Sequence, residues 1–406
     1  MSRRGAGRGA AFILGPVLAL SVCASSVAAA PAPSRAVVTW AASADRMGDD
    51  VSDRSHRLIV HTSTGGRDLR IRLSNAFGDR PLTFGAVWAG VQDSGAQVAD
   101  ASNRQLTFGG SHSVTLAPGE FRYSDPLPGR VKAQSNLVIS LYVQSAGGPA
   151  TGHGMALQTS YSAAGNHASE QAADAYTEQS GSWLYLDAVT VEAAPGTGAV
   201  ATLGDSITDG WQSTTDKNRR WPDYLARRLQ SSADSTVRGV ANEGISGNKV
   251  LADGAGQSAL KRLDRDVLSQ SGVRTVVVFE GINDIKSHSA VTAAGLIAGY
   301  REIIARAHTA GKCVVGATVL PYRGWYEWTP AEEAIREEVN EFVRTSGEFD
   351  AVADFDRMLR SPYDAERMLP TFDGGDHLHP NDKGMQAMAD SVDLTSLECD
   401  RLTPGG

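Results

Sequence analysis

The stretch AVATLGDSITDG (199–210) decides the fold of the second half of this chain. Its first five residues are apolar or small and predict a buried strand, and Gly204 lets the backbone turn sharply where that strand ends. Similar strands are predicted at four further places, which are STVRGVA (235–241), RTVVVFE (274–280), KCVVGATVL (312–320) and FDAVADF (349–355). Continuous apolar strands of this kind are typical of parallel sheets that are covered on both faces.

Amphipathic helices are predicted between these strands, at PDYLARRLQ (222–230), SALKRLDRDVLSQ (258–270), residues 294–310, residues 331–347 and from about Asn381 onward. Strands that alternate with helices predict an α/β domain, which we place at residues 199–397. In such sheets, ligands bind beyond the carboxyl ends of the strands. The functional residues are therefore expected at that edge.

Residues 36–192 follow a different pattern, with period two and turns at short spacing. Six segments predict strands: RLIVHTS (57–63), DLRIRLSNAFG (68–78), LTFGAVWAG (82–90), HSVTLAPGEF (112–121), NLVISLYVQ (136–144) and LYLDAVTVEA (184–193). Many short strands with alternating faces predict an all-β sandwich or jelly roll. The stretch AAPGTG (193–198) is predicted to link this β domain to the α/β domain.

The first thirty residues have the pattern of a secretory signal peptide. Arg3, Arg4 and Arg8 precede the apolar run AAFILGPVLALSV (10–22), and small residues follow before Pro31. The apolar run is too short to span a bilayer, so neither a transmembrane helix nor a stable membrane anchor is expected. The sequence predicts export to the extracellular space.

Charge and cysteine content limit the partners of the exported chain. The net charge of −8 at pH 7 argues against binding to nucleic acid, because no basic excess is present to neutralise phosphates. Two cysteines, Cys313 and Cys399, remain after signal cleavage. They could form one disulfide in an oxidising compartment, or Cys313 could be a small buried apolar residue.

Polar residues follow three successive strands of the predicted parallel sheet. Ser206 follows the first strand, NEGISGN (242–248) the second and GIND (281–284) the third. A serine at a strand end between glycines has an accessible hydroxyl, and neighbouring glycine N–H groups and an asparagine amide can stabilise an oxyanion. Each motif alone could be an ordinary turn, with Ser206 as a helix cap. Their shared position at one sheet edge favours the catalytic interpretation.

The segment DGGDHLHP (373–380) supplies the other candidate residues. A histidine can take a proton from a serine when an acceptor holds its second ring nitrogen, and an acid three residues earlier can do this. Two alternatives stay open. The side chains of Asp373, Asp376, His377 and His379 could ligate a metal, or the segment could be a polar turn before the last helix.

These four motifs, in this order, resemble the signature blocks of the SGNH (GDSL) hydrolase superfamily over about residues 198–395. The resemblance implies a flavodoxin-like three-layer α/β/α fold and the hydrolysis of carboxylic esters of lipids, aryl alcohols or acetylated sugars without a metal or other cofactor. It implies Ser206 as nucleophile and, through its N–H, as an oxyanion donor. Gly247 is implied as the second donor, with Gly244 the weaker choice, and Asn283 as the third. His379 is implied as the base, and Asp376 as the residue that orients it.

The layout is similar to that of secreted actinobacterial esterases with a β-rich domain before the catalytic one, and short acyl esters, such as acetyl esters on carbohydrate, are the expected substrates. A lipase or phospholipase of the same family is an alternative, since YRGWYEW (322–328) could accept an acyl chain. A second alternative is a polysaccharide-binding protein that uses Trp40, Trp88, Trp183 and Tyr185 for stacking, although core or inter-domain packing explains these residues better. In a third, the β domain shapes the entrance of the site, and Trp211, Trp221, Trp325 and Trp328 line that entrance from the α/β domain.

Overall fold

The computed structural model describes residues 1–2, 36–49, 51–287 and 290–398. The predicted signal peptide, except for its first two residues, and Cys399 lie outside these ranges. Signal cleavage and the bridge between Cys313 and Cys399 therefore stay predictions. Among the helices of the described ranges, none is both long enough and apolar enough to cross a bilayer.

A five-stranded parallel sheet forms the centre of residues 198–398, called the α/β half below. Its strands are β17 (Gly198–Gly204), β18 (Val237–Gly244), β19 (Val273–Phe279), β20 (Cys313–Ala317) and β21 (Ala351–Ala353). The spatial order β18-β17-β19-β20-β21 is the flavodoxin-like order 2-1-3-4-5. The predicted parallel sheet is confirmed. The order in which successive strands are added to the sheet reverses between β17 and β19, and folds of this kind bind ligands at such a point.

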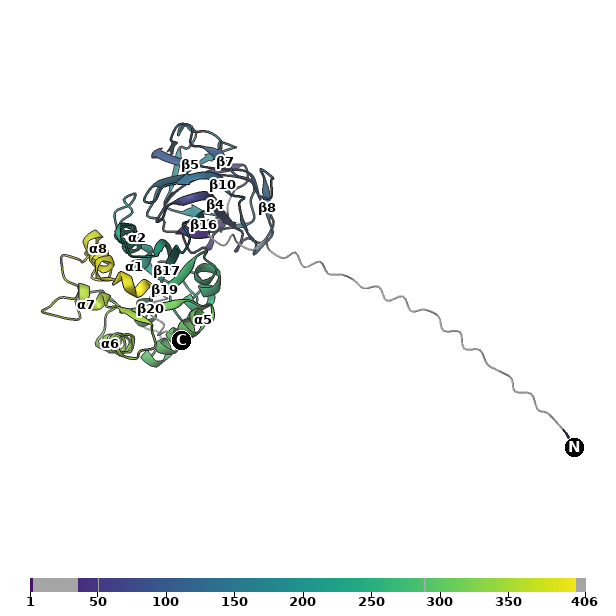
Figure 1. Cartoon of the computed structure of the whole chain (residues 1–406). Coiled ribbons are helices and arrows are strands. Elements are labelled where there is room, and N and C mark those ends of the chain that lie inside the picture. Colours follow the sequence, from purple (N-terminus) through teal and green to yellow (C-terminus); the bar gives the residue numbers. More distant parts are fainter. Residues whose placement is uncertain (3–35, 50, 288–289, 399–406) are drawn as a thin grey trace. The chain divides into compact units, whose positions relative to one another are not determined.

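Helices cover both faces of this sheet, as Figure 1 shows. One face carries α2 (Trp221–Ser231), α7 (Phe355–Leu359) and α8 (Asp382–Ser391), and the other carries α3 (Ala259–Arg262), α5 (Ala293–Thr309) and α6 (Pro330–Thr345). Side chains of β19 alternate between the two layers: Val276 and Val278 face α5, whereas Val277 and Phe279 face α2. The three-layer prediction is confirmed.

Three shorter helices lie at strand ends or near the end of the described chain: α1 (Ser206–Asp209), α4 (Ile282–Ile285) and the 3-10 helix Leu394–Leu397. The helix predicted at 258–270 differs from expectation, because after α3 it widens into a π-helical turn at Leu263–Leu268. Such turns often occur near functional sites. Here the turn directly follows the buried Arg262.

Residues 36–192, called the β-rich half below, form an antiparallel sandwich. One sheet contains β1 (Ala36–Ala41), β4 (Gly66–Ser74), β9 (Phe121–Tyr123), β10 (Leu127–Val131) and β16 (Leu186–Glu192). The other contains β3 (Arg54–His61), β5 (Leu82–Ser94), β6 (Gln97–Val98), β7 (Arg104–Gln105), β8 (Val114–Leu116), β11 (Asn136–Ser145), β13 (Ser160–Ala164) and β14 (Glu178–Ser180). A small third sheet joins β2 (Asp45–Asp49), β12 (Pro149–His153) and β15 (Trp183–Leu184). Apolar residues of the two large sheets pack into one core, which confirms the predicted sandwich.

Three of the four aromatic residues considered for a stacking platform lie inside this core. Trp40, Trp183 and Tyr185 are all at most 4% exposed. The Trp40 and Trp183 rings meet edge to face with centroids 4.9 Å apart, and the Trp183 indole N–H donates to Ile59 O. The stacking interpretation is wrong for these three residues, because their rings are buried in the core and cannot contact a sugar.

The two halves share a hydrophobic cluster. Val37 and Val38 of β1 belong to the same buried cluster as Leu203 and Val276 of the parallel sheet. Strand β18 is an edge of that sheet, and its Val240 N–H donates to the hydroxyl of Ser63 from the β-rich half. Edge strands need such cover, since their free N–H groups otherwise invite pairing with other chains. The predicted linker 193–198 lies between β16 and β17, while the division into separate domains stays a prediction.

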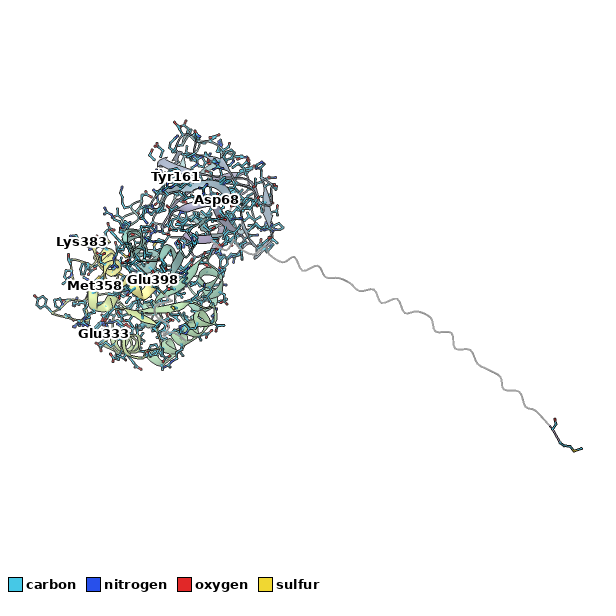
Figure 2. All side chains as sticks on the ribbon, viewed as in Figure 1. Asp68, Tyr161, Glu333, Met358, Lys383 and Glu398 are labelled. Atoms are coloured by element: carbon cyan, nitrogen blue, oxygen red, sulfur yellow. The ribbon has the colours of Figure 1, made fainter. Side chains whose placement is uncertain are left out.

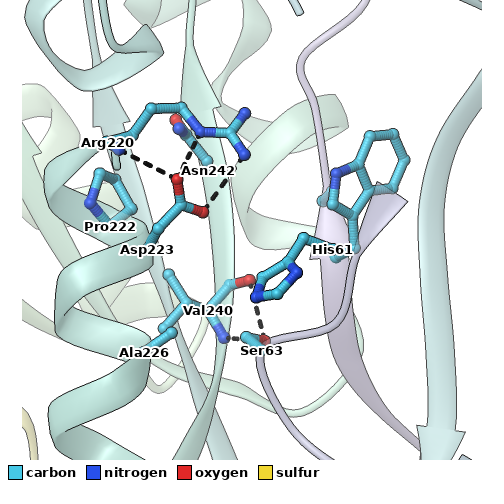
Figure 3. Close-up of a pocket in the computed structure, with 10 residues that line it drawn as sticks. His61, Ser63, Arg220, Pro222, Asp223, Ala226, Val240 and Asn242 are labelled. Carbon is cyan, nitrogen blue, oxygen red and sulfur yellow. Dashed lines mark hydrogen bonds and ion pairs between the residues drawn. The ribbon is translucent and has the colours of Figure 1, made fainter. Parts of the chain in front are cut away.

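Little space remains between α2 and the β-rich half. A cavity of about 20 Å³ there is lined by Trp40, His61, Ser63, Arg220 and Asp223, among others (Figure 3). Such a volume holds about one water molecule.

Glu398, labelled in Figure 2, lies at the end of the described chain. It accepts the Thr236 N–H at 2.7 Å, which holds the chain end against the start of β18.

The shared cluster predicts that the chain unfolds in one step. Val38→Ala removes two buried methyl groups at the contact between the halves and should lower the free energy of unfolding by roughly 2 kcal/mol. Calorimetry should show one transition that moves as a whole, and the exposed Val352→Ala is the matched control with little expected change. Two separate transitions, of which Val38→Ala moves only one, would contradict the prediction.

Candidate active site

Ser206 lies at the carboxyl end of β17, in the first turn of α1. The chain turns there without clashes because residue 204 is glycine: a Cβ on Gly204 would lie 2.1 Å from Thr208 Oγ1 and 2.6 Å from Phe279 O. The Asp205 carboxylate caps α1 by accepting the Ile207 N–H at 3.0 Å. This turn fixes the Ser206 hydroxyl at the sheet edge.

The structure brings Ser206 and His379 together across 173 positions of sequence. Ser206 Oγ lies 2.8 Å from His379 Nε2, and His379 Nδ1 lies 2.7 Å from Asp376 Oδ2. The other oxygen of Asp376 accepts the backbone N–H groups of Leu378 and His379. The carboxylate therefore closes its own turn and holds the imidazole ring toward the serine.

The charge of Asp376 is also fixed by these contacts. Burial on its own would raise the pKa of Asp376, but hydrogen bonds from the His379 ring and from two backbone N–H groups lower it well below the ordinary value. An ionised carboxylate requires hydrogen on His379 Nδ1. In a neutral ring, Nε2 is then free to accept the hydroxyl proton of Ser206.

The four acidic and histidine residues near the C-terminus form two separate pairs. His377 Nδ1 contacts Asp373 Oδ2 at 2.6 Å, and the His377 side chain is half exposed. Asp376 and His379 form the other pair. Within the ranges that the structure describes, no three His, Cys, Asp or Glu side chains are grouped as metal ligands.

The three predicted oxyanion donors come from neighbouring strand ends. Gly204 pairs in register with Gly244 on β18 and with Phe279 on β19. Gly247 follows three residues after Gly244, with φ of 80°, and Asn283 lies in α4 just after β19. The strand order thus places Ser206 between the loops of Gly247 and Asn283. Asn283 Nδ2 donates to Asn248 O at 2.9 Å, which leaves its second amide hydrogen for another acceptor.

Gly244, the weaker choice for the second donor, has a different task. Its N–H donates to Asn242 Oδ1 at 3.0 Å. A Cβ at this position would lie 2.3 Å from Asp209 N, so the glycine lets β18 approach α1 closely. The contacts of Gly244 are consistent with Gly247 as the donor.

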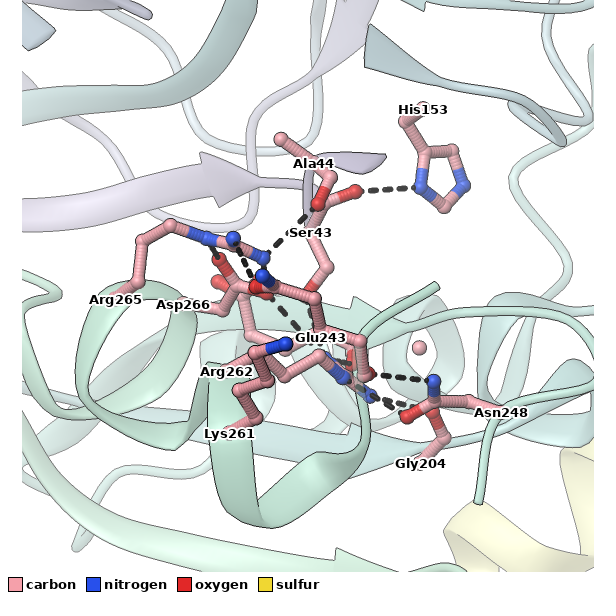
Figure 4. A network of polar contacts seen from close by, with 12 residues as sticks. Ser43, Ala44, His153, Gly204, Glu243, Asn248, Lys261, Arg262, Arg265 and Asp266 are labelled. Atoms are coloured by element: carbon pink, nitrogen blue, oxygen red, sulfur yellow. Dashed lines mark hydrogen bonds and ion pairs between the residues drawn. The ribbon is translucent and has the colours of Figure 1, made fainter. Parts of the chain in front are cut away.

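Arg262 is the main residue of the site that the sequence analysis missed. Its side chain is completely buried, and its guanidinium donates to Gly204 O, Glu243 O, Asn248 Oδ1 and Ser43 Oγ at 2.7–3.0 Å (Figure 4). These contacts tie together the ends of β17 and β18, the loop after β18 and the β-rich half. An arginine on an amphipathic helix is usually a surface residue, so the sequence offered no signal.

Aromatic rings flank His379 on two sides. The Trp211 and Trp325 rings lie 6.2 Å and 6.1 Å from the imidazole ring, centroid to centroid. Trp211 is 45% exposed and Tyr326 81%, while Trp328 is half-buried. The expectation that Trp221 lines the entrance is wrong, because Trp221 is fully buried and packs edge to face against Phe355.

A Ser–His–Asp chain at the carboxyl edge of a 2-1-3-4-5 sheet is an arrangement typical of serine hydrolases. Residues 202–387 match the model of the GDSL-like Lipase/Acylhydrolase family. This part of the chain is similar to the GDSL-like acylhydrolases, and the match supports both the resemblance to the SGNH/GDSL hydrolase superfamily and the carboxylic ester hydrolase class that the sequence motifs predicted. No curated protein matches the chain.

Several solved structures are similar to the α/β half. A putative lipolytic protein of the G-D-S-L family from Desulfitobacterium hafniense is 20% identical, with a TM-score of 0.39, 51% of this chain covered and 100% of that one. A carbohydrate acetylesterase from Sinorhizobium meliloti is 18% identical, with a TM-score of 0.38 and coverage of 50% and 98%. An acetylxylan esterase from Geobacillus stearothermophilus is 20% identical, with a TM-score of 0.38 and coverage of 49% and 94%.

Asp205 predicts a pH dependence of stability. Burial raises the pKa of Asp205 to about 6, against about 4 in an unfolded chain. The folded state therefore holds this proton at higher pH, and the resulting stabilisation is lost as the pH rises from about 4 through about 6. Asp205→Asn cannot titrate but can still cap α1, so the stability of the wild type relative to this variant should fall over that interval in urea titrations.

Asp382→Asn is the matched control, because hydrogen bonds from Thr214 and Arg219 overcome the effect of burial and lower the pKa of Asp382. Wild-type stability relative to this variant should instead fall as the pH drops below about 4. A difference between wild type and Asp205→Asn that stays constant from pH 4 to pH 7 would contradict the prediction.

Proposed function

We propose that this chain is a serine esterase that works through an acyl-enzyme, with Ser206 as nucleophile, His379 as general base and Asp376 as the residue that orients His379. The observation that carries the proposal is the continuous contact from Ser206 Oγ through His379 to Asp376, at 2.8 Å and 2.7 Å. The match of residues 202–387 to a family of acylhydrolases supports the same reaction class.

In the proposed first step, His379 Nε2 takes the Ser206 proton as Oγ attacks the ester carbonyl carbon. The carbonyl oxygen becomes negative and accepts hydrogen bonds from the N–H groups of Ser206 and Gly247 and from the Asn283 amide. The alcohol leaves with the proton held by His379. Water then attacks the acyl-enzyme with His379 as base, and the carboxylic acid is released.

The surroundings of His379 favour an ester whose alcohol carries a ring. Trp211 and Trp325 flank the imidazole, and Trp211 exposes nearly half of its surface. Exposed indole faces bind flat apolar surfaces, such as an aryl group or one face of a sugar ring. We propose a short acyl group, such as acetyl, on a ring-bearing alcohol, with a long-chain lipid ester as the alternative that an ester panel tests.

We also propose that the protein is exported. The proposal is supported by the basic residues, apolar run and small residues within positions 1–30. N-terminal sequencing of the protein from culture medium should find a chain that begins near Pro31. A chain that still carries the apolar run would contradict it.

Replacing the proposed catalytic residues should abolish hydrolysis without unfolding the protein. Ser206→Ala and His379→Ala should each lower kcat/KM for an aryl acetate by about 10⁴-fold or more, and Asp376→Asn by less, because orientation is secondary to proton transfer. His377→Ala is the matched control, since His377 forms a similar pair with Asp373. A loss in His377→Ala as large as in His379→Ala would contradict the assignment of His379, rather than His377, as the general base.

The aromatic side chains should affect substrate binding more than the rate of the chemical step. Trp211→Ala and Trp325→Ala should raise KM about 3- to 10-fold for acetylated aryl alcohols or acetylated sugars and change it little for ethyl acetate. Tyr363→Ala, at a 95% exposed position, is the control. Equal KM changes for all three kinds of ester would argue against ring stacking, and a preference for long acyl chains would favour the lipase alternative.

A further inference from the structure

We propose that His153 of the β-rich half is a positioning residue for the oxyanion hole, an inference that rests on the proposed function. His153 ends β12, and its side chain is 6% exposed. Its Nε2 lies 2.8 Å from Asp209 Oδ1, in the same short helix as Ser206. The β-rich half therefore reaches the turn that carries the nucleophile.

Asp209 also contacts the loop after β18, residues 245–248, which contains Gly247 and is called the oxyanion loop below. Its second oxygen, Oδ2, accepts the Ser246 N–H at 2.9 Å and the Ser246 hydroxyl at 2.8 Å. Ser246 directly precedes Gly247, the proposed second donor. The orientation of the peptide before Gly247 thus depends on the Asp209 carboxylate, and the Asp209 carboxylate is held in turn by His153.

The contacts of the His153 ring require hydrogen on both nitrogens. Nδ1 lies 2.9 Å from Ser43 O (Figure 4). Nε2 faces Met155 O at 3.1 Å as well as the Asp209 carboxylate. All three partners are acceptors, and a neutral ring carries only one N–H. Burial alone would lower the pKa of His153, but Asp209 and the two carbonyl groups raise it overall. His153 therefore forms a buried ion pair with Asp209.

The ring has little freedom to move. Trp183 lies against it with centroids 5.6 Å apart, and the Arg220 guanidinium lies over a Trp183 ring at 5.7 Å from its centroid. The Ser246 hydroxyl lies 3.2 Å from Met155 Sδ, so the same β-rich segment also contacts the oxyanion loop directly. A rigid support of this kind matters because a small displacement of a donor lowers transition-state stabilisation far more than substrate binding.

Two substitutions of His153 distinguish its hydrogen bond to Asp209 from its hydrogen bond to Ser43 O. The amide nitrogen of glutamine in His153→Gln can occupy the Nε2 position and donate to Asp209, while the shorter His153→Asn can donate to Ser43 O and cannot reach Asp209. Both lose the positive charge. We expect His153→Asn to lower kcat for an aryl acetate about 10- to 100-fold with KM changed less than about 3-fold, and His153→Gln to keep kcat within a few-fold of the wild type.

Ser63→Ala is the control for a general effect of weakening the contact between the halves, because it removes the hydrogen bond to Val240 of β18, outside the oxyanion loop. It should lower Tm and leave kcat unchanged. Wild-type kcat in His153→Asn, or equal losses in the Asn and Gln variants, would overturn the proposal and leave His153 a purely structural residue.

A double-mutant cycle that combines His153→Asn with Asp209→Asn tests whether His153 acts through Asp209. If His153 acts through Asp209, the double variant should lose no more kcat than the more damaged single variant. Additive losses would overturn the proposal. Failure of the proposed function is distinguishable, since it would appear as activity retained in Ser206→Ala, whatever the His153 variants do.

Discussion

The completely buried guanidinium of Arg262 is the constraint on which the rest of the site depends. A full charge without access to water is tolerated only when its hydrogens are matched by acceptors. Arg262 finds them in Gly204 O, Glu243 O, Asn248 Oδ1 and Ser43 Oγ. Because Gly204 is the last residue of β17 and Glu243 the last but one of β18, matching the charge also fixes the turn before Ser206 and the loop that contains Gly247.

Ser43 shows why the β-rich half belongs to this arrangement. Its hydroxyl accepts from Arg262 and donates to Glu243, and its carbonyl accepts from His153. Burial raises the pKa of Glu243, whose carboxyl group accepts from Ser43, well above its ordinary value. Ser43 thus contacts both Arg262, which holds Glu243 O and Asn248 Oδ1 at the two ends of the loop that contains Gly247, and His153, which contacts Asp209. Through these contacts Ser43 and His153 of the β-rich half support the proposed active site.

The sequence predicted the parts of the site that belong to short local patterns. Ser206, Gly247 and Asn283 each follow an apolar strand, and Asp376 lies three residues before His379, so a strand pattern and a turn suffice to place them. Arg262 and His153 have no such pattern. The contact of Ser43 with Arg262 joins residues 219 positions apart, and it exists only because the sandwich packs against the parallel sheet. Burial likewise separates Trp221 from Trp211, which the sequence could not do, since both are tryptophans near the same strand end.

The two sides of Ser206 therefore have different physical characters. On the oxyanion side, buried charges and their acceptors leave little room for change, because altering one partner leaves another buried polar group unmatched. On the side of His379, the exposed Trp211 and the partly buried Trp325, from the loops after β17 and β20, pack against the imidazole. Rings of that kind can be exchanged without leaving a charge unpaired. In the proposed esterase, changes in the Trp211 and Trp325 loops can therefore alter substrate preference while the proposed oxyanion donors stay fixed.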